Sequence, residues 1–161
     1  MRDVKRAAAQ AQGMKTGARS PLRRGYREHI VPRGPHHLYA RDYPGKEPAI
    51  VLLHGFPDDQ HLYDRLVPEL IERRVIAFDF LGWGRSDKPT GHAYTASNQT
   101  GDIEAIVGHL QLGSVVLVTH DASGPPAVDW ALNHADQVSG LVLLNTYYCR
   151  MPGLRPPEAI W

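Results

Sequence analysis

An aspartate stands between an apolar run and a helical segment in the stretch VLVTHDASGPPAVDWAL, residues 116–132. A parallel strand that turns directly into a helix places its turn residue at the carboxyl edge of the sheet, where open α/β sheets bind ligands. Asp121 occupies this turn, with small residues after it that suit a sharp bend and two prolines that suit a first helical turn. A carboxylate placed there can act as a nucleophile, or it can cap the helix.

The elements that must position Asp121 are short apolar runs that alternate with helical segments. Runs that are apolar throughout are buried on both faces, which is typical of parallel strands, and their alternation with helices indicates βαβ units. We therefore predict an α/β protein, a three-layer αβα sandwich whose mostly parallel sheet begins with a hairpin. The predicted strands are 26–31, 36–43, 49–54, 75–80, 114–120 and 140–145, and the predicted helices are 64–73, 97–112 and 125–138.

Charge divides the chain into a basic N-terminal segment and an acidic body. Residues 1–27 contain eight Lys or Arg and one acid, which gives +7, and the rest sums to −6 because the whole chain has a net charge of +1. The segment has no apolar stretch of the kind that a secretory signal requires. We expect residues 1–25 to be a disordered basic extension, with targeting or weak polyanion binding as the alternative.

Composition argues against several classes of function. The excess of positive charge lies in residues 1–27 and the rest of the chain is acidic, so nucleic-acid recognition is not expected. The apolar runs are too short to span a membrane. Cys149 is the one cysteine, so neither an internal disulfide nor a metal site built on cysteines can form. We expect a cytoplasmic protein without metal or cofactor.

Two further motifs stand at the ends of predicted strands. The tetrapeptide HGFP occupies residues 54–57, and the stretch DFLGWGRSD occupies residues 79–87. Together with the elbow at Asp121, these motifs resemble the α/β-hydrolase fold, in the branch of epoxide hydrolases and haloalkane dehalogenases, where an aspartate replaces the serine of esterases. The resemblance covers roughly residues 26–150.

The resemblance implies a role for the residues of these motifs. Asp121 would attack an epoxide or alkyl halide and form an alkyl-enzyme ester, and the backbone N–H groups of Phe56 and Ala122 would bind the oxyanion that forms when water attacks this ester. Pro57 would help to fix the orientation of Phe56, because a residue before proline is restricted to extended geometry. The residues expected to be structural and near the site are His54, Gly55, Pro57 and His120.

Neighbouring residues offer competing interpretations. Ser123 is a candidate esterase nucleophile, but its neighbours two positions away, Asp121 and Pro125, do not suit an elbow. Gly82 and Gly84 lack the third glycine of a dinucleotide fingerprint and better fit a loop that needs permissive backbone.

The elbow departs from the family pattern in its small residues. Thr119 and Ser123 replace the usual glycines, and Ala122 stands where haloalkane dehalogenases typically have a tryptophan whose indole N–H binds the departing halide. Ala122 has no side-chain donor, so the sequence favours epoxide hydrolase over dehalogenase. Other hydrolytic or lyase activities of the fold stay open, and the expected substrate is a small epoxide, haloalkane or ester.

The family's catalytic histidine and acid are expected to be absent from this chain. The predicted sixth strand is followed by Asn145-Thr146-Tyr147-Tyr148, without the acid that some dehalogenases have there. We expect residues 26–150 to form the N-terminal part of the hydrolase core, truncated after the sixth strand, and residues 151–161 to begin a cap. The strand 140–145 would be an apolar edge open to self-association. A non-catalytic fragment or binding module remains the alternative to an enzyme.

Overall fold

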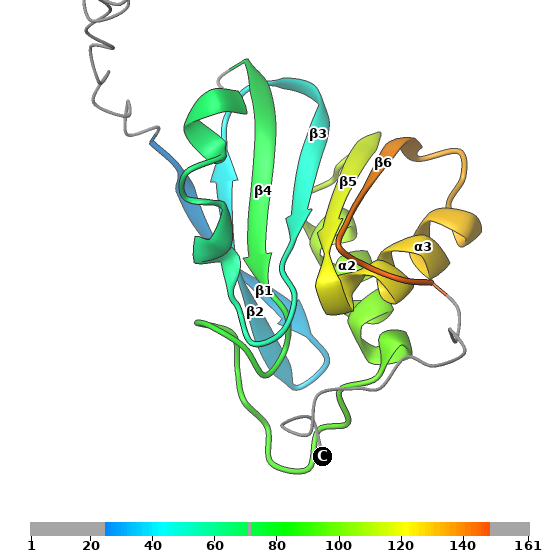
Figure 1. Cartoon of the computed structure of the whole chain (residues 1–161). Helices are drawn as coiled ribbons and strands as arrows, with labels where there is room; N and C mark the ends of the chain where they lie inside the picture. Colours follow the sequence, from blue (N-terminus) through cyan, green and yellow to red (C-terminus); the bar gives the residue numbers. More distant parts are fainter. Residues whose placement is uncertain (1–24, 71, 149–161) are drawn as a thin grey trace, which may run out of the picture.

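Six strands form one sheet: β1 (Arg27–Arg33), β2 (His36–Tyr43), β3 (Lys46–Leu53), β4 (Arg73–Asp79), β5 (Val115–His120) and β6 (Val138–Leu144). Their order across the sheet is β1-β2-β4-β3-β5-β6 (Figure 1). The computed structural model describes residues 25–70 and 72–148. The predicted extension up to residue 24, Cys149 and the predicted cap segment 151–161 lie outside the described residues.

Pairing in the sheet is antiparallel at one end and parallel over the rest. β1 and β2 form a hairpin whose turn contains Gly34 in the left-handed region, at φ 60°, and β2 pairs antiparallel with β4. Parallel pairs join β4 to β3, β3 to β5, and β5 to β6. The predicted strands and the mostly parallel sheet are confirmed.

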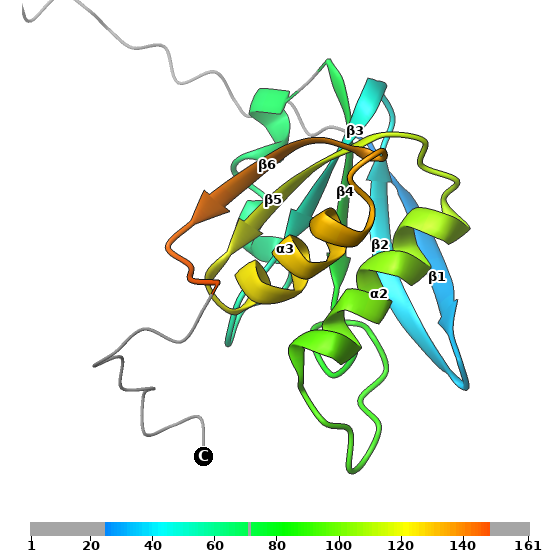
Figure 2. The same cartoon turned by 90° about the vertical axis from the view of Figure 1, so that its right-hand side faces the viewer.

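Two α-helices, α2 (Ala96–His109) and α3 (Gly124–Asn133), cover one face of the sheet (Figure 2). The side chain of Thr95 accepts a hydrogen bond from the Asn98 N–H at 3.2 Å and so caps the start of α2. Prolines lack a backbone N–H and fit in the first turn of α3, because N–H groups in a first helical turn have no intrahelical acceptor. Both helices match predicted ones but end earlier. No described helix is long and apolar enough to cross a membrane.

The prediction of an α-helix over residues 64–73 is wrong. Two short 3-10 helices, η1 (Gln60–Tyr63) and η2 (Val67–Leu70), cover the opposite face of the sheet instead. Pro68 lies inside the predicted helix, where it has no N–H to donate and its ring clashes with the carbonyl four residues earlier. The three layers are therefore present, with 3-10 turns as the described layer on this face (Figure 1).

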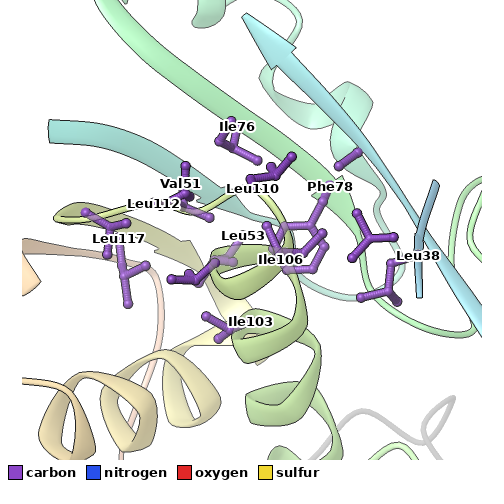
Figure 3. Close-up of a cluster of buried hydrophobic side chains, with 14 of the residues drawn as sticks. Leu38, Val51, Leu53, Ile76, Phe78, Ile103, Ile106, Leu110, Leu112 and Leu117 are labelled. Atoms are coloured by element: carbon purple, nitrogen blue, oxygen red, sulfur yellow. The ribbon is translucent and has the colours of Figure 1, made fainter. Parts of the chain in front are cut away.

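The sheet divides the apolar core into two clusters. The larger cluster lies under the α-helices and includes Val51 and Ile103, both fully buried (Figure 3). In the smaller cluster, Leu52 packs with Tyr63 and Val67 of the 3-10 helices. The adjacent residues Val51 and Leu52 enter different clusters because successive side chains of a strand point to opposite faces. β3 is thus held from both sides, and its carboxyl end has a fixed place.

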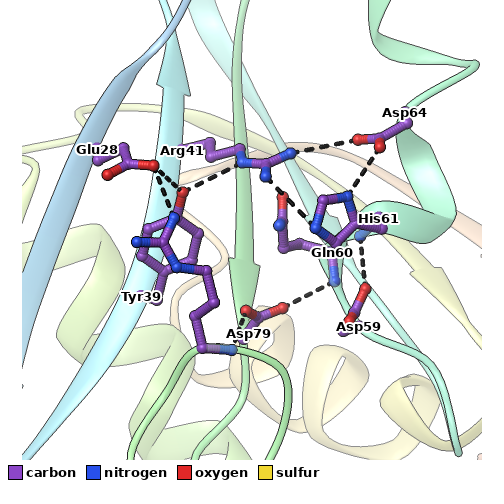
Figure 4. A network of polar contacts seen from close by, with 9 residues as sticks. Glu28, Tyr39, Arg41, Asp59, Gln60, His61, Asp64 and Asp79 are labelled. Atoms are coloured by element: carbon purple, nitrogen blue, oxygen red, sulfur yellow. Dashed lines mark hydrogen bonds and ion pairs between the residues drawn. The ribbon is translucent and has the colours of Figure 1, made fainter.

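A polar network joins the loops that follow β3 and β4 (Figure 4). The buried carboxylate of Asp79, at the end of β4, accepts hydrogen bonds from the backbone N–H groups of Gln60 and Arg85, both at 2.8 Å. Arg41 of β2 donates to Asp64 at 3.3 Å, just beyond η1. Asp79 therefore fixes the two loops relative to each other. The loop after β3 contains the HGFP motif, and the loop after β4 contains the rest of the stretch DFLGWGRSD.

Candidate active site

Asp121 lies at a strained turn between β5 and α3. His120 ends β5 in extended backbone, at φ −133°, Asp121 has a positive φ of 52°, and a single 3-10 turn, η3 (Asp121–Ser123), leads into α3. A positive φ is uncommon for a residue other than glycine and costs about 1–3 kcal/mol. The turn holds Asp121 at the carboxyl edge of the parallel sheet.

The HGFP loop lies beside this aspartate. β3 and β5 pair in parallel with Leu53 opposite Thr119, so the residues that follow the two strands emerge side by side. The backbone N–H of Phe56 donates a hydrogen bond of 3.0 Å to Oδ2 of Asp121. Gly55 permits this approach, because a Cβ at its position would lie 2.6 Å from the Asp121 Cβ.

His54 supports the loop through both of its ring nitrogens. The backbone N–H of Phe80 donates to Nε2 at 3.2 Å, so the ring proton lies on Nδ1, which donates to the Gly55 carbonyl at 2.9 Å. Burial lowers the pKa of His54, which favours this neutral form. Because both nitrogens are engaged with the backbone, His54 is not available to take a proton from water.

Aromatic rings lie next to the HGFP loop. Phe56 is 38% exposed, and its ring packs edge-to-face on Trp83 with a centroid distance of 5.4 Å. Trp83 in turn contacts the ring of Tyr94 at 5.7 Å. Gly82, at φ 96°, lies against the Tyr94 ring, where a Cβ would clash. Such apolar surface beside a carboxylate suits a small organic substrate.

The other residues singled out in the sequence lie at the same edge of the sheet. Ala122 follows Asp121 in η3, at the start of a helical segment, where backbone N–H groups have no intrahelical partners. Nδ1 of His120 is buried without a hydrogen-bond partner, and Pro57 follows Phe56 across a cis peptide bond. Among the described residues, no group of three or more His, Cys, Asp or Glu side chains could hold a metal ion.

The two residues in place of the elbow glycines contact each other. Thr119 Oγ1 lies 2.6 Å from Ser123 Oγ, and both residues are fully buried. A buried hydroxyl cannot reach a substrate, so Ser123 is excluded as an esterase nucleophile. Sequence reasoning missed this contact, although two hydroxyl residues four positions apart around a sharp bend were a signal for it.

Comparison with known proteins identifies the family of the chain. The model of the family described as alpha/beta hydrolase fold matches residues 48–159, more than half of the chain. The chain belongs to this family. The predicted resemblance and the predicted fold class of this alpha/beta hydrolase are thereby confirmed.

Curated relatives of this alpha/beta hydrolase have several activities. The chain is 32% identical over 141 residues to a cis-3-alkyl-4-alkyloxetan-2-one decarboxylase of Shewanella oneidensis. This match covers 84% of this chain and 44% of the relative. It is 36% identical over 105 residues to haloalkane dehalogenase 2 of Mycobacterium bovis, and this match covers 65% of this chain and 37% of the relative. The chain thus spans less than half the length of these relatives.

Similar solved structures include a haloalkane dehalogenase and an epoxide hydrolase, beside an esterase. The haloalkane dehalogenase DatA from Agrobacterium tumefaciens has a TM-score of 0.71 and 28% identity, and the match covers 76% of this chain and 42% of that chain. The epoxide hydrolase CorEH has a TM-score of 0.70 and 25% identity, with coverage of 84% and 47%. These likenesses support a hydrolase by family.

Proposed function

We propose that Asp121 is the nucleophile of a hydrolase that opens epoxides through an alkyl-enzyme ester. The observation behind this proposal is the hydrogen bond from the Phe56 N–H to Asp121 Oδ2, made at a turn with positive φ. A helix N-cap directs its oxygen to an N–H two or three residues further along its own helix. The described bond of Asp121 instead reaches a loop 65 residues earlier in the chain.

The first chemical step needs only the carboxylate. Oδ1 of Asp121 attacks a carbon of the epoxide, the ring carbon–oxygen bond breaks, and the ring oxygen takes a proton from water. Carboxylates are ionised near neutral pH, so no base is required. Oδ2 keeps its hydrogen bond from Phe56 and becomes the carbonyl oxygen of the ester.

The second step is the attack of water on this ester, during which negative charge develops on Oδ2. The Phe56 N–H points to that oxygen before the reaction starts, and we assign the Ala122 N–H as the second donor. One such preorganised donor contributes about 3–4 kcal/mol to lowering the barrier. This step also requires a base for the water. His54 does not supply one, because its nitrogens are bound to Gly55 and Phe80.

Haloalkane dehalogenation is the second candidate, supported by the similarity to dehalogenases. A departing halide needs hydrogen-bond donors, and the residue after the nucleophile, Ala122, has a methyl side chain. The oxygen of an epoxide stays attached to the product and can be protonated by water. Epoxide opening is therefore the reaction that the elbow supports better.

The test is the intact mass of the 161-residue chain after incubation with a small strained epoxide. We expect a gain of at most one epoxide mass per chain, without repeated turnover, because the ester would persist when no base activates water. Asp121→Asn should abolish this adduct, whereas Asp136→Asn, a change at an exposed aspartate, should not. Ser123→Ala should still form the adduct on Asp121.

Other outcomes select the alternatives. A haloalkane reacts with the gain of its alkyl group and the loss of hydrogen halide, so faster labelling of Asp121 by a haloalkane would select dehalogenation. Turnover of many equivalents would mean that a base exists within this chain. Labelling spread over exposed carboxylates, unchanged by Asp121→Asn, would refute the proposal and favour a non-catalytic fragment or binding module.

A further inference from the structure

Ser123 connects the ends of two neighbouring strands through one buried hydroxyl. Its Oγ accepts a hydrogen bond from the His120 N–H at 3.0 Å and donates to the Leu53 carbonyl at 2.9 Å. It also lies 2.6 Å from Thr119 Oγ1 and 2.9 Å from the His120 carbonyl. Leu53 ends β3 and His120 ends β5, so the hydroxyl bridges the two strands where the candidate site begins.

The hydrogen-bond capacity of this hydroxyl is fully used. A serine hydroxyl has one proton and two lone pairs. The His120 N–H and the Thr119 hydroxyl occupy the lone pairs, and the proton is left for the Leu53 and His120 carbonyls. Because Ser123 is fully buried, water cannot replace any of these partners when the hydroxyl is removed.

This bridge sits between the two halves of the candidate site. Phe56 follows Leu53 by three residues in the HGFP loop, and Asp121 follows His120 directly. The gap between loop and elbow is narrow, since the Phe56 N–H to Asp121 Oδ2 distance is 3.0 Å and Gly55 leaves no room for a Cβ. A small shift of one strand end against the other would therefore lengthen the bond to Oδ2.

We propose that Ser123 is a positioning residue, which holds the Phe56 N–H against the Asp121 carboxylate by fixing the end of β3 to the end of β5. This role rests on the proposed function of Asp121. The elbow pattern of the family has glycines at positions 119 and 123, so the bridge through the Ser123 hydroxyl is a feature of this chain's own residues. Catalytic groups that move by about 1 Å can lose about a hundredfold in rate.

The experiment compares Ser123→Ala with Thr119→Val in the full chain. Thr119→Val removes the other hydroxyl of the pair and leaves the Ser123 bond to Leu53 in place, so it is the matched control. The first measurement is the amide proton shift of Phe56, which reports the hydrogen bond to Asp121 without any reaction. The second is the rate of epoxide adduct formation on Asp121.

We expect Ser123→Ala to move the Phe56 amide proton upfield and to slow adduct formation about tenfold. Thr119→Val should leave both measurements near their wild-type values, even where its thermal midpoint falls. A Phe56 amide shift that is unchanged in Ser123→Ala would overturn the positioning role. So would equal effects of both variants that follow their loss of stability. If the wild-type chain forms no adduct, the proposed function fails, and the Phe56 shift alone decides the role of Ser123.

Discussion

His54 holds the HGFP loop through hydrogen bonds of both its ring nitrogens. It is 2% exposed, accepts from the Phe80 N–H and donates to the Gly55 carbonyl, so it connects the loop after β3 with the end of β4. Protonation of the His54 ring would put a hydrogen on Nε2. This N–H would then face the Phe80 N–H, and the hydrogen bond from Phe80 would be lost. The neutral ring is therefore a condition for the geometry beside Asp121.

We predict that stability falls with acidification partly through His54. Burial lowers its pKa in the folded state below the ordinary 6.5, so the unfolded state binds the proton more readily. Stability is then fully present above pH 6.5 and is lost as the pH falls towards the folded pKa, by at most about 1.4 kcal/mol per pH unit. His54→Gln should reduce this slope, measured by urea unfolding between pH 7.5 and 5.5.

The control for this slope is His109→Gln, which changes an exposed histidine of α2. We expect it to retain the wild-type dependence on pH. If the free energy of unfolding of His54→Gln changes with pH as steeply as that of the wild type, His54 is not the group that resists protonation.

At this scale the sequence predicted that Asp121 and Phe56 lie together at one edge of the sheet, as the structure shows, but not the other contacts around them. Asp121 and Phe56 could be placed because each follows an apolar run that is readable as a strand, and parallel strand ends meet at one edge. The contact between the Thr119 and Ser123 hydroxyls could not be predicted. A residue's type says whether it can form a hydrogen bond, but not which partner it has in the folded chain. The positive φ of Asp121 is likewise a property of the folded turn.

Among the secondary-structure elements, one ion pair fastens the hairpin to the helical layer. Arg33 of β1 donates to Asp102 of α2 at 2.8 Å, and Asp102 also accepts from the Leu81 N–H at 3.0 Å. Gly101 allows Arg33 to lie close, because a Cβ there would clash with its guanidinium. Burial raises the pKa of Asp102, and the Leu81 N–H and Arg33 act against this. The pair therefore keeps a buried carboxylate satisfied.

We predict that Arg33→Ala destabilises the chain by about 2–3 kcal/mol, because it leaves the Asp102 carboxylate, 1% exposed, with one partner fewer. The measurement is the urea midpoint at unchanged slope. Lys46→Ala is the control. It breaks an ion pair with Glu72 whose partners are 76% and 77% exposed, and such pairs contribute about 1 kcal/mol or less. Equal losses in the two variants would contradict the structural role of Arg33.

The elements were predictable where apolar runs have a clear period, and less so where tertiary contacts decide. The strands followed from short apolar runs such as 49–54, which are typical of strands buried on both faces of a sheet. The segment 64–73 has helical spacing of apolar residues, but Pro68 cannot take part in an α-helix there. The ion pair of Arg33 and Asp102 joins residues 69 positions apart, and no local sequence pattern predicts a contact over such a separation.

At the scale of the whole molecule, β6 is notable because it exposes several apolar side chains. It is the last strand of the described sheet, and Leu141, Val142, Leu143 and Leu144 are 36–50% exposed. An apolar edge strand with free backbone groups is a template for pairing with another chain. We therefore expect this chain to self-associate through β6 as its concentration rises.

Leu143→Lys should shift the chain towards monomer, because a charge on an edge strand opposes pairing. The measurement is light scattering coupled to size exclusion over a range of concentrations. Leu132→Lys makes the same change at a 67% exposed position of α3 and should leave the association as it is in the wild type. Equal dissociation in both variants would point to a general effect of charge instead of pairing at β6.

The measurement that tests the central claim most directly is a peptide map of the chain after reaction with a small strained epoxide. If Asp121 is the nucleophile, the added mass lies on the peptide that contains it, fragment ions place it on this carboxylate, and one equivalent persists after the reagent is removed. The other acids of the chain, which has 17 Asp and Glu in total, should stay unlabelled. A map in which Asp121 is labelled no faster than exposed carboxylates would contradict the account.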